Sequence, residues 1–105
     1  MLNQLIFVGK NLNKIEVIKN ENGEKYAVIT LEIPRSFKNA DGEYETDYIS
    51  AIAYDNIAAN TAEYLLPGDI VGIKSHAERP SQDSELKIIA EKITFLSKSK
   101  SEESE

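Results

Sequence analysis

Residues 26–54 constrain the fold more than any other part of this 105-residue sequence, because two alternating segments flank one polar turn. Successive side chains of a strand point to opposite faces. The apolar alternate positions of the two segments are Ala27, Ile29, Leu31 and Ile33, then Ile49, Ala51 and Ala53. Ala40-Asp41-Gly42 lies between them and has turn composition. The pattern predicts a β-hairpin with one face on a core, whose first strand should end at Pro34, which cannot donate to a ladder.

The opposite face of the second strand carries two aromatic rings. Its residues are Tyr48, Ser50, Ile52 and Tyr54. At the first foot of the loop, Arg35 and Lys38 flank the ring of Phe37. Bases stack on such rings while cations follow phosphates, so the set fits a single strand of nucleic acid. The rings would serve equally well as a contact with a neighbouring subunit or a folded-over loop, and this stretch alone leaves both interpretations open.

The N-terminal part of the chain predicts another strand and a tight turn. Residues 5–8 are apolar on both faces, so one face needs a cover besides the core, most simply another subunit. Gly9 and Lys10 are expected to end that run. Residues 15–19 continue as extended chain to a turn at residues 20–23, where Asn-Gly favours a hairpin.

Residues 55–66 carry the clearest helical pattern, with an apolar stripe and with Asp55 or Asn56 to cap the start. Pro67-Gly68 should end the helix. Residues 70–77 and 86–96 predict two more strands around a polar loop at 79–85. Three strands, a helix and two strands indicate an all-β domain with one short helix, the five-stranded Greek-key barrel of the OB fold. The domain should span residues 1–96, followed by a short disordered polar tail at 97–105.

Composition limits the cellular context and the partners. The net charge of −6 counts against binding duplex DNA by charge alone, but it does not exclude a local basic groove. The absence of cysteine rules out a disulfide framework and fits a reducing compartment. No apolar run is long enough to cross a bilayer, and the first residues lack a signal-peptide pattern. We therefore expect a cytoplasmic location and no membrane partner.

Catalytic and metal-binding patterns are weak. The single histidine, His76, has no carboxylate at a recognisable spacing, and the sequence contains neither a nucleophile elbow nor a glycine-rich loop before a helix. Acidic residues alternate through the hairpin loop at Asp41, Glu43, Glu45 and Asp47. The glycine of a calcium loop would stand elsewhere, so we interpret these acids as a solvated edge that repels phosphate. We expect no enzyme activity, cofactor, metal or small-molecule substrate.

Taken together, the motifs resemble the bacterial single-stranded DNA-binding proteins over almost the whole folded part. The matching pieces are the opening Met1-Leu2-Asn3-Gln4, Val8-Gly9-Lys10, Asn22-Gly23, Asp41-Gly42-Glu43, Asp47-Tyr48, Tyr64-Leu65 with Gly68, and Ile88-Ile89-Ala90-Glu91 with Phe95-Leu96. The resemblance implies sequence-independent binding of single-stranded DNA in replication, recombination or repair, near the nucleoid. It also implies a homo-oligomer, either a tetramer or a dimer.

The resemblance also implies site residues. Stacking rings would be Phe37, Tyr48 and Tyr54, and the cations that contact DNA would be Lys10, Arg35, Lys38, Lys74 and Arg79. Three departures weaken it: the 79–85 loop has no aromatic residue, Ile18 stands where the family often has arginine, and no long acidic and apolar C-terminal tip follows. These departures imply a specialised paralogue, and they leave open a second function, an OB module that binds proteins and has little or no DNA affinity.

Overall fold

The computed structural model describes residues 1–97, which form six strands and one helix. In chain order these elements are β1 (Leu5–Asn11), β2 (Ile18–Lys19), β3 (Lys25–Lys38), β4 (Tyr44–Tyr54), α1 (Asp55–Tyr64), β5 (Ile70–Glu78) and β6 (Lys87–Ser97). The expected residue 97–105 tail lies almost entirely outside the described residues, and Ser97 itself ends β6. Among residues 1–97, no helix has the length and apolar character to span a membrane.

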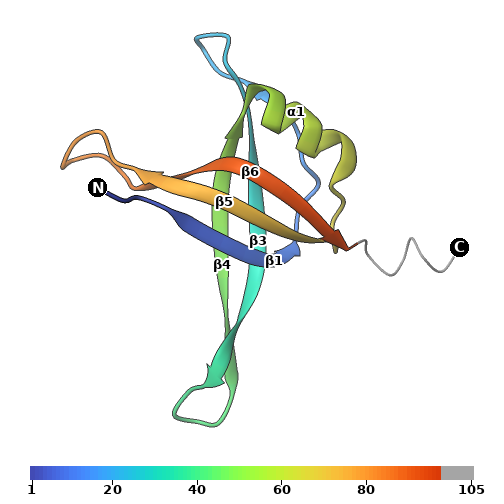
Figure 1. The fold of residues 1–105 in the computed structure, drawn as a ribbon, viewed down its shortest axis with the longest axis vertical. Helices are drawn as coiled ribbons and strands as arrows, with labels where there is room; N and C mark the ends of the chain where they lie inside the picture. The colour runs from blue at the N-terminus through green and yellow to red at the C-terminus, as the bar shows by residue number, and fades with distance from the viewer. Residues whose placement is uncertain (98–105) are drawn as a thin grey trace, which may run out of the picture.

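Five of the strands close into a barrel (Figure 1). The sheet runs β1-β5-β6-β4-β3-β2, and β1 also pairs with β3, through Lys10 opposite Glu32 and Asn11 opposite Leu31. Strand β1 therefore does not end at Gly9 and Lys10 as expected, because its last residues make the closing contact. Gly9 lies where β1 crosses β3, and a Cβ there would stand 2.6 Å from Ile33 Cγ1 and 2.8 Å from the backbone oxygen of Glu32. The predicted five-stranded OB barrel is confirmed.

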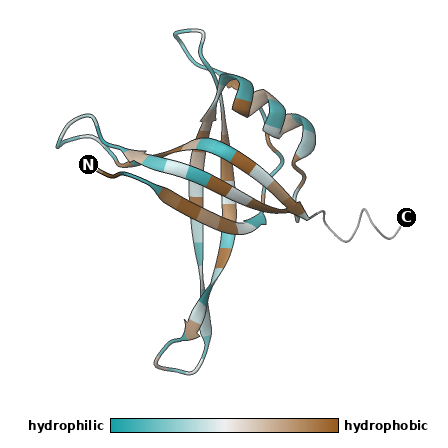
Figure 2. Ribbon diagram, viewed as in Figure 1, coloured by the Kyte–Doolittle hydropathy of each residue, from teal (hydrophilic) through white to brown (hydrophobic). Residues whose placement is uncertain are grey.

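The core lies inside the barrel and under α1. Its largest buried apolar side chains are Ile29, Leu31, Leu65, Val71 and Ile73. Figure 2 shows hydrophobic residues concentrated along the barrel strands and hydrophilic residues in the loops. The predicted inward faces of the hairpin are confirmed, since Ala27, Ala51 and Ala53 are almost fully buried. Burial of these alternate positions fixes the opposite face of β3 and β4 as the outer one.

The ends of α1 differ from the prediction. Asp55 is the first helical residue, with φ of 51°, and within the described chain neither Asp55 nor Asn56 supplies a side-chain cap. The helix ends at Tyr64, two residues before the predicted end. Leu66 precedes Pro67, and a residue before proline is pushed away from the helical region. The amide of Leu65 still donates to the Thr61 carbonyl at 2.9 Å and closes the last turn.

Strand β3 continues through Pro34, contrary to the prediction that it ends there. Pro34 pairs with Thr46, and the register shifts between Pro34 and Lys38. In the described chain, β1 pairs with β3 only at Leu31 and Glu32, so beyond that point β3 is an edge strand that tolerates a proline. Residues 33–47 therefore extend beyond the barrel as a two-stranded projection, called the arm below (Figure 1, the long hairpin at the bottom).

Candidate nucleic-acid interface

The outer face of β3 and β4 carries side chains in rows across the strands. Lys10 lies opposite Glu32, which lies opposite Tyr48, so these three side chains form one row over β1, β3 and β4. Tyr48 is 64% exposed. In the neighbouring row of the same outer face, the hydroxyls of Thr30 and Ser50 are hydrogen-bonded to each other at 2.9 Å. This part of the site brings a predicted stacking ring and a predicted cation together, with one carboxylate between them.

Tyr54 lies farther along β4, directly opposite Tyr26 on β3. Their ring centroids are 6.5 Å apart, with ring planes tilted by 52°. The two rings border a hollow of about 290 Å³, whose other lining residues are Asn20, Ile52 and Lys87. Sequence reasoning missed Tyr26, Asn20 and Lys87 as site residues. Tyr26 faces Tyr54 only once β3 and β4 pair in this register, so the alternation within one strand could not have identified it.

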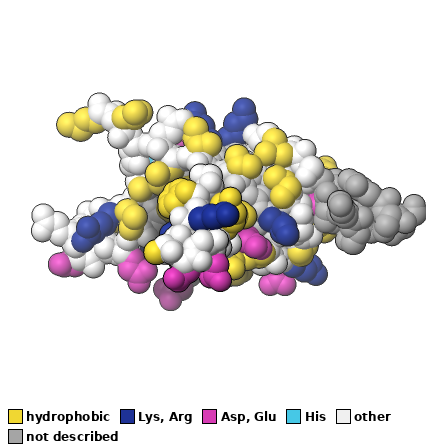
Figure 3. All heavy atoms as spheres, turned by 90° about the horizontal axis from the view of Figure 1, so that it is seen from below, with side chains coloured by type: hydrophobic (Ala, Val, Ile, Leu, Met, Phe, Trp, Pro, Cys, Tyr) yellow, Lys and Arg dark blue, Asp and Glu magenta, His cyan; other side chains and the backbone are white. Residues whose placement is uncertain are grey.

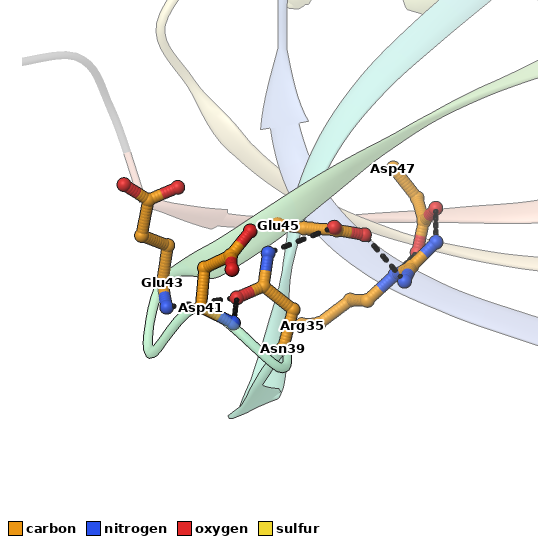
Figure 4. Close-up of polar contacts among 6 residues, drawn as sticks. All are labelled: Arg35, Asn39, Asp41, Glu43, Glu45 and Asp47. Carbon is orange, nitrogen blue, oxygen red and sulfur yellow. Dashed lines mark hydrogen bonds and ion pairs between the residues drawn. The ribbon is translucent and has the colours of Figure 1, made fainter.

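Arg35 is bound to two carboxylates of the arm (Figure 4). Its Nε donates to Asp47 Oδ2 and its Nη2 to Asp47 Oδ1, both at 3.0 Å, and its Nη1 donates to Glu45 Oε1 at 2.8 Å. Hydrogen bonding between Arg35 and Asp47 raises the pKa of Arg35 and holds the pKa of Asp47 below its usual value. Strand alternation places Glu45 and Asp47 on the face of the arm opposite Tyr48. Arg35 is therefore not grouped with the tyrosines.

The acids predicted as a solvated edge have two different environments. Glu45 and Asp47 bind Arg35, and the second oxygen of Glu45 accepts from Asn39 Nδ2 at 2.9 Å. At the turn, Asn39 Oδ1 accepts from the backbone amides of Asp41 and Glu43 (Figure 4). The carboxylates of Asp41 and Glu43 make no ion pair within residues 1–97. In that same part of the chain, no group of three or more acids and histidines is arranged to hold a metal ion.

Lys38 and Phe37 lie near the tip of the arm. Lys38 is paired with Tyr44, and its Nζ lies 5.7 Å from the centre of that ring. Tyr44 shares a face with Tyr48 by alternation, so Lys38 belongs to the tyrosine face. Phe37, a predicted stacking ring, is exposed. Tyr44, also exposed, is a further ring that the sequence reasoning did not include.

The comparisons with known proteins identify the family. A model described as the single-strand binding protein family matches residues 2–96. The chain belongs to that family. Single-stranded DNA-binding protein B of Bacillus subtilis is 31% identical over 91% of both chains, and single-stranded DNA-binding protein 2 of Staphylococcus aureus is 29% identical over 91% of this chain and 74% of its own. The resemblance predicted from the motifs is confirmed. The family description names binding, which agrees with the expectation of no enzyme activity.

Solved structures agree on the fold of this family member. The mitochondrial single-stranded DNA-binding protein of S. cerevisiae superposes with a TM-score of 0.71 at 17% identity, covering 90% of this chain and 94% of that one. A deletion mutant of the Thermus aquaticus single-stranded DNA-binding protein gives the same TM-score and identity, covering 90% of this chain and 50% of its own. At this identity the likeness establishes the barrel and its helix.

The two remaining predicted cations of this family member lie away from the tyrosines. Arg79 donates from Nε to the Ser84 carbonyl at 3.1 Å and from Nη2 to the Gln82 carbonyl, so its side chain organises the 79–85 loop. Lys74 stands in a row between Ile6 and Lys92 on β1, β5 and β6. Neither residue shares the β3–β4 face with Tyr48.

His76 has the carboxylate partners that the sequence did not reveal. Its Nδ1 lies 2.6 Å from Glu91 Oε2, and its Nε2 lies 2.7 Å from Glu78 Oε2. These hydrogen bonds, the one to Glu78 first, raise the pKa of His76. The expectation of a histidine without a carboxylate partner was wrong, because Glu78 lies on the same face of β5 two residues along and β6 brings Glu91 beside β5. With both ring nitrogens engaged, the imidazole is fixed between strands and ties β5 to β6.

The outer side of β1 exposes an apolar patch, formed by Ile6, Val8 and Leu96. Ile6 is 67% exposed and Val8 is 53% exposed. Gly72 lies between Val8 and Leu96, and a Cβ at that position would stand 3.8 Å from a methyl of each. The residue 5–8 segment is thus apolar on an outer face as well as on the inner one, as the sequence indicated.

Charge is unevenly distributed over the surface. Seen from the arm side in Figure 3, most of the acidic side chains in view lie along the lower edge, whereas hydrophobic and basic side chains are scattered over the rest of that face. The net charge of −6 therefore does not describe the local field at every part of the barrel.

Proposed function

We propose that this chain binds single-stranded DNA without sequence preference, across the outer face of β3 and β4. The observation that carries the proposal is the run of exposed or half-exposed rings on that face, with Tyr48 near the arm and the Tyr26–Tyr54 pair toward α1. Bases of a flexible single strand stack on such rings, whereas the paired bases of a duplex do not present their faces. Family membership and the names of the relatives support the same conclusion.

Lysines beside the rings supply the phosphate contacts. Lys10 shares a row with Tyr48, Lys38 lies by Tyr44, and Lys87 lines the hollow at Tyr54. Each lysine that neutralises a phosphate adds about −0.7 to the slope of log affinity against log salt on single strands. Because stacking accepts every base, sequence preference should be slight.

The test is a titration of a labelled oligo-dT strand, followed by anisotropy, with Tyr48→Ala and Tyr54→Ala. Losing one stacked base at either ring costs about 1–3 kcal/mol, which weakens binding roughly 5- to 160-fold. Tyr64→Leu, which removes a ring on α1, is the control and should retain full affinity. Unchanged binding by a correctly assembled double variant would exclude these rings as the platform, and binding of a protein partner would then be the better explanation.

We also infer that the functional unit is a homo-oligomer, a tetramer or a dimer, joined through the apolar patch of Ile6, Val8 and Leu96. In water such a patch is stabilised by burial, and a second copy of the same strand offers a matching surface. The DNA-binding unit is residues 1–96, and deletion of residues 97–105 should leave it intact. A cytoplasmic protein that protects single strands during replication, recombination or repair fits this chemistry and the absence of cysteine.

A further inference from the structure

The N–H groups of Arg35 are arranged as they would be to bind a phosphate, but two carboxylates of the same chain occupy that position. The guanidinium presents two parallel N–H groups, Nε and Nη2, to the two oxygens of Asp47, and a third N–H to Glu45 (Figure 4). A fork of this kind accepts a carboxylate or a phosphate in the same bidentate manner. One arginine with two carboxylates leaves a local charge of −1, so the group repels DNA while the pairs are formed.

Both masking residues have a contact that does not involve Arg35, Glu45 through its carboxylate and Asp47 through its backbone. Asn39 donates to the free oxygen of Glu45, and the same asparagine accepts two amides of the turn. Asp47 belongs to β4 and pairs with Ile33 of β3. The Arg35 side chain is the longest of the three, so we expect it to be the partner that moves when a phosphate competes for it.

The ion pairs are weak enough to exchange. The side chains of Arg35, Glu45 and Asp47 are 41%, 48% and 45% exposed. Ion pairs this open to solvent contribute little net stability, because water and side-chain entropy offset the attraction. The arm is only two strands wide, and β3 is its edge beyond Glu32. A DNA strand lying over Tyr48 needs only to turn round that edge for a phosphate to reach Arg35.

We propose that Glu45 and Asp47 mask Arg35 and so limit the affinity of the arm for the DNA backbone. This inference rests on the proposed function, since the ligand that displaces the carboxylates is a phosphate of single-stranded DNA. In the masked state Arg35 makes no contribution to the affinity, and the acids lower it. Removal of the acids exposes the guanidinium and adds one phosphate contact.

The test compares two variants with the same change of charge. Glu45→Gln with Asp47→Asn releases Arg35, whereas Asp41→Asn with Glu43→Gln neutralises two acids of the same hairpin that do not touch it. The first pair should tighten oligo-dT binding by up to about fivefold at low salt, the limit set by an exposed ion pair of at most about 1 kcal/mol. It should also steepen the salt slope by about 0.7. The control pair should give a smaller gain and an unchanged number of contacts.

Arg35→Ala in each background separates masking from general charge. With Arg35 absent, the gain from Glu45→Gln with Asp47→Asn should fall to that of the control pair. An equal gain with and without Arg35 would refute the masking and leave only general repulsion. A chain that binds oligo-dT through Tyr48 but shows no response to the acid pair would keep the proposed function and remove this inference. Absence of binding by every folded variant, including the parent chain, would overturn both. Far-UV circular dichroism and light scattering establish that each variant is folded and assembled.

Discussion

Replacing Ile6 and Val8 with glutamate should dissociate the proposed homo-oligomer without unfolding the barrel. Both side chains lie on the outer side of β1, so the core does not depend on them. In an assembled protein they would be covered by a second copy, and a glutamate there would place an unpaired charge in an apolar contact. Such a charge loses its hydration with no partner to replace it.

The size of the effect follows from the exposed fractions of the two side chains. Full burial of a valine or isoleucine is worth about 1.5–3 kcal/mol relative to exposure. Scaled by 67% for Ile6 and 53% for Val8, coverage of both gives about 2–4 kcal/mol per subunit. A twofold contact counts this contribution twice, for about 4–7 kcal/mol in total. The dissociation constant should therefore rise by roughly 10³ to 10⁵ in the double variant.

Size-exclusion chromatography with multi-angle light scattering measures the dissociation directly, at protein concentrations in the micromolar range. The variant should elute with the mass of one chain, 11.7 kDa, and the parent chain with a multiple of it. Leu12→Glu with Val17→Glu, which places the same two charges on exposed apolar positions outside the patch, should leave the oligomer intact. A parent chain that is monomeric at these concentrations, or a variant that keeps its assembly, would show that this patch is not the contact.

Three further predictions concern pH, packing and the hollow. Folding raises the pKa of His76, so the imidazole contributes its full stabilisation below the unfolded pKa of about 6.5 and loses it as pH rises through the folded pKa. Urea unfolding from pH 5.5 to 9 should show this decline in the free energy of unfolding, and His76→Gln should make the pH dependence flatter. Gly9→Ala should lower the free energy of unfolding by about 1–3 kcal/mol, because the added methyl would lie under 3 Å from atoms of β3. Gly72→Ala is the control in the same urea titration and should be tolerated, because its methyl would make only ordinary contacts. Tyr26→Leu should weaken oligo-dT binding by up to about 1–3 kcal/mol, the range for one stacked base. Lys87→Ala should weaken it too, with a salt slope shallower by about 0.7. Full affinity of both variants would exclude the hollow from the DNA path.

The sequence predicts the barrel and the faces of its central hairpin well, because both follow from local alternation. Ala27, Ala51 and Ala53 are buried as their spacing requires, and Tyr48 is exposed for the same reason. A single periodic pattern decides these positions, and burial of one face leaves no other register open. The apolar outer side of β1 was visible in the same way.

Features that depend on neighbours distant in the chain were not predictable from alternation. Pro34 lies within β3 because no partner strand pairs with it opposite β4 in the described chain, which the sequence does not reveal. The hollow beside Tyr54 forms only when Tyr54 pairs with Tyr26. Counting residues back from the turn would pair Tyr54 with the wrong residue of β3, because the register shifts between Pro34 and Lys38. Glu91 reaches His76 only after β5 and β6 pair.

The placement of the acids explains how a chain of net charge −6 is compatible with DNA binding. Glu45 and Asp47 lie on the face of the arm opposite Tyr48, whereas Lys10 and Lys38 lie on the tyrosine face. Exposed charges are screened over about 8 Å at physiological ionic strength, so a strand on the tyrosine face responds mainly to the groups beside it. Glu32 is the acid in that row, directly between Lys10 and Tyr48. If DNA binds as proposed, this arrangement should attract its backbone on the tyrosine face and repel it from the acids on the opposite face.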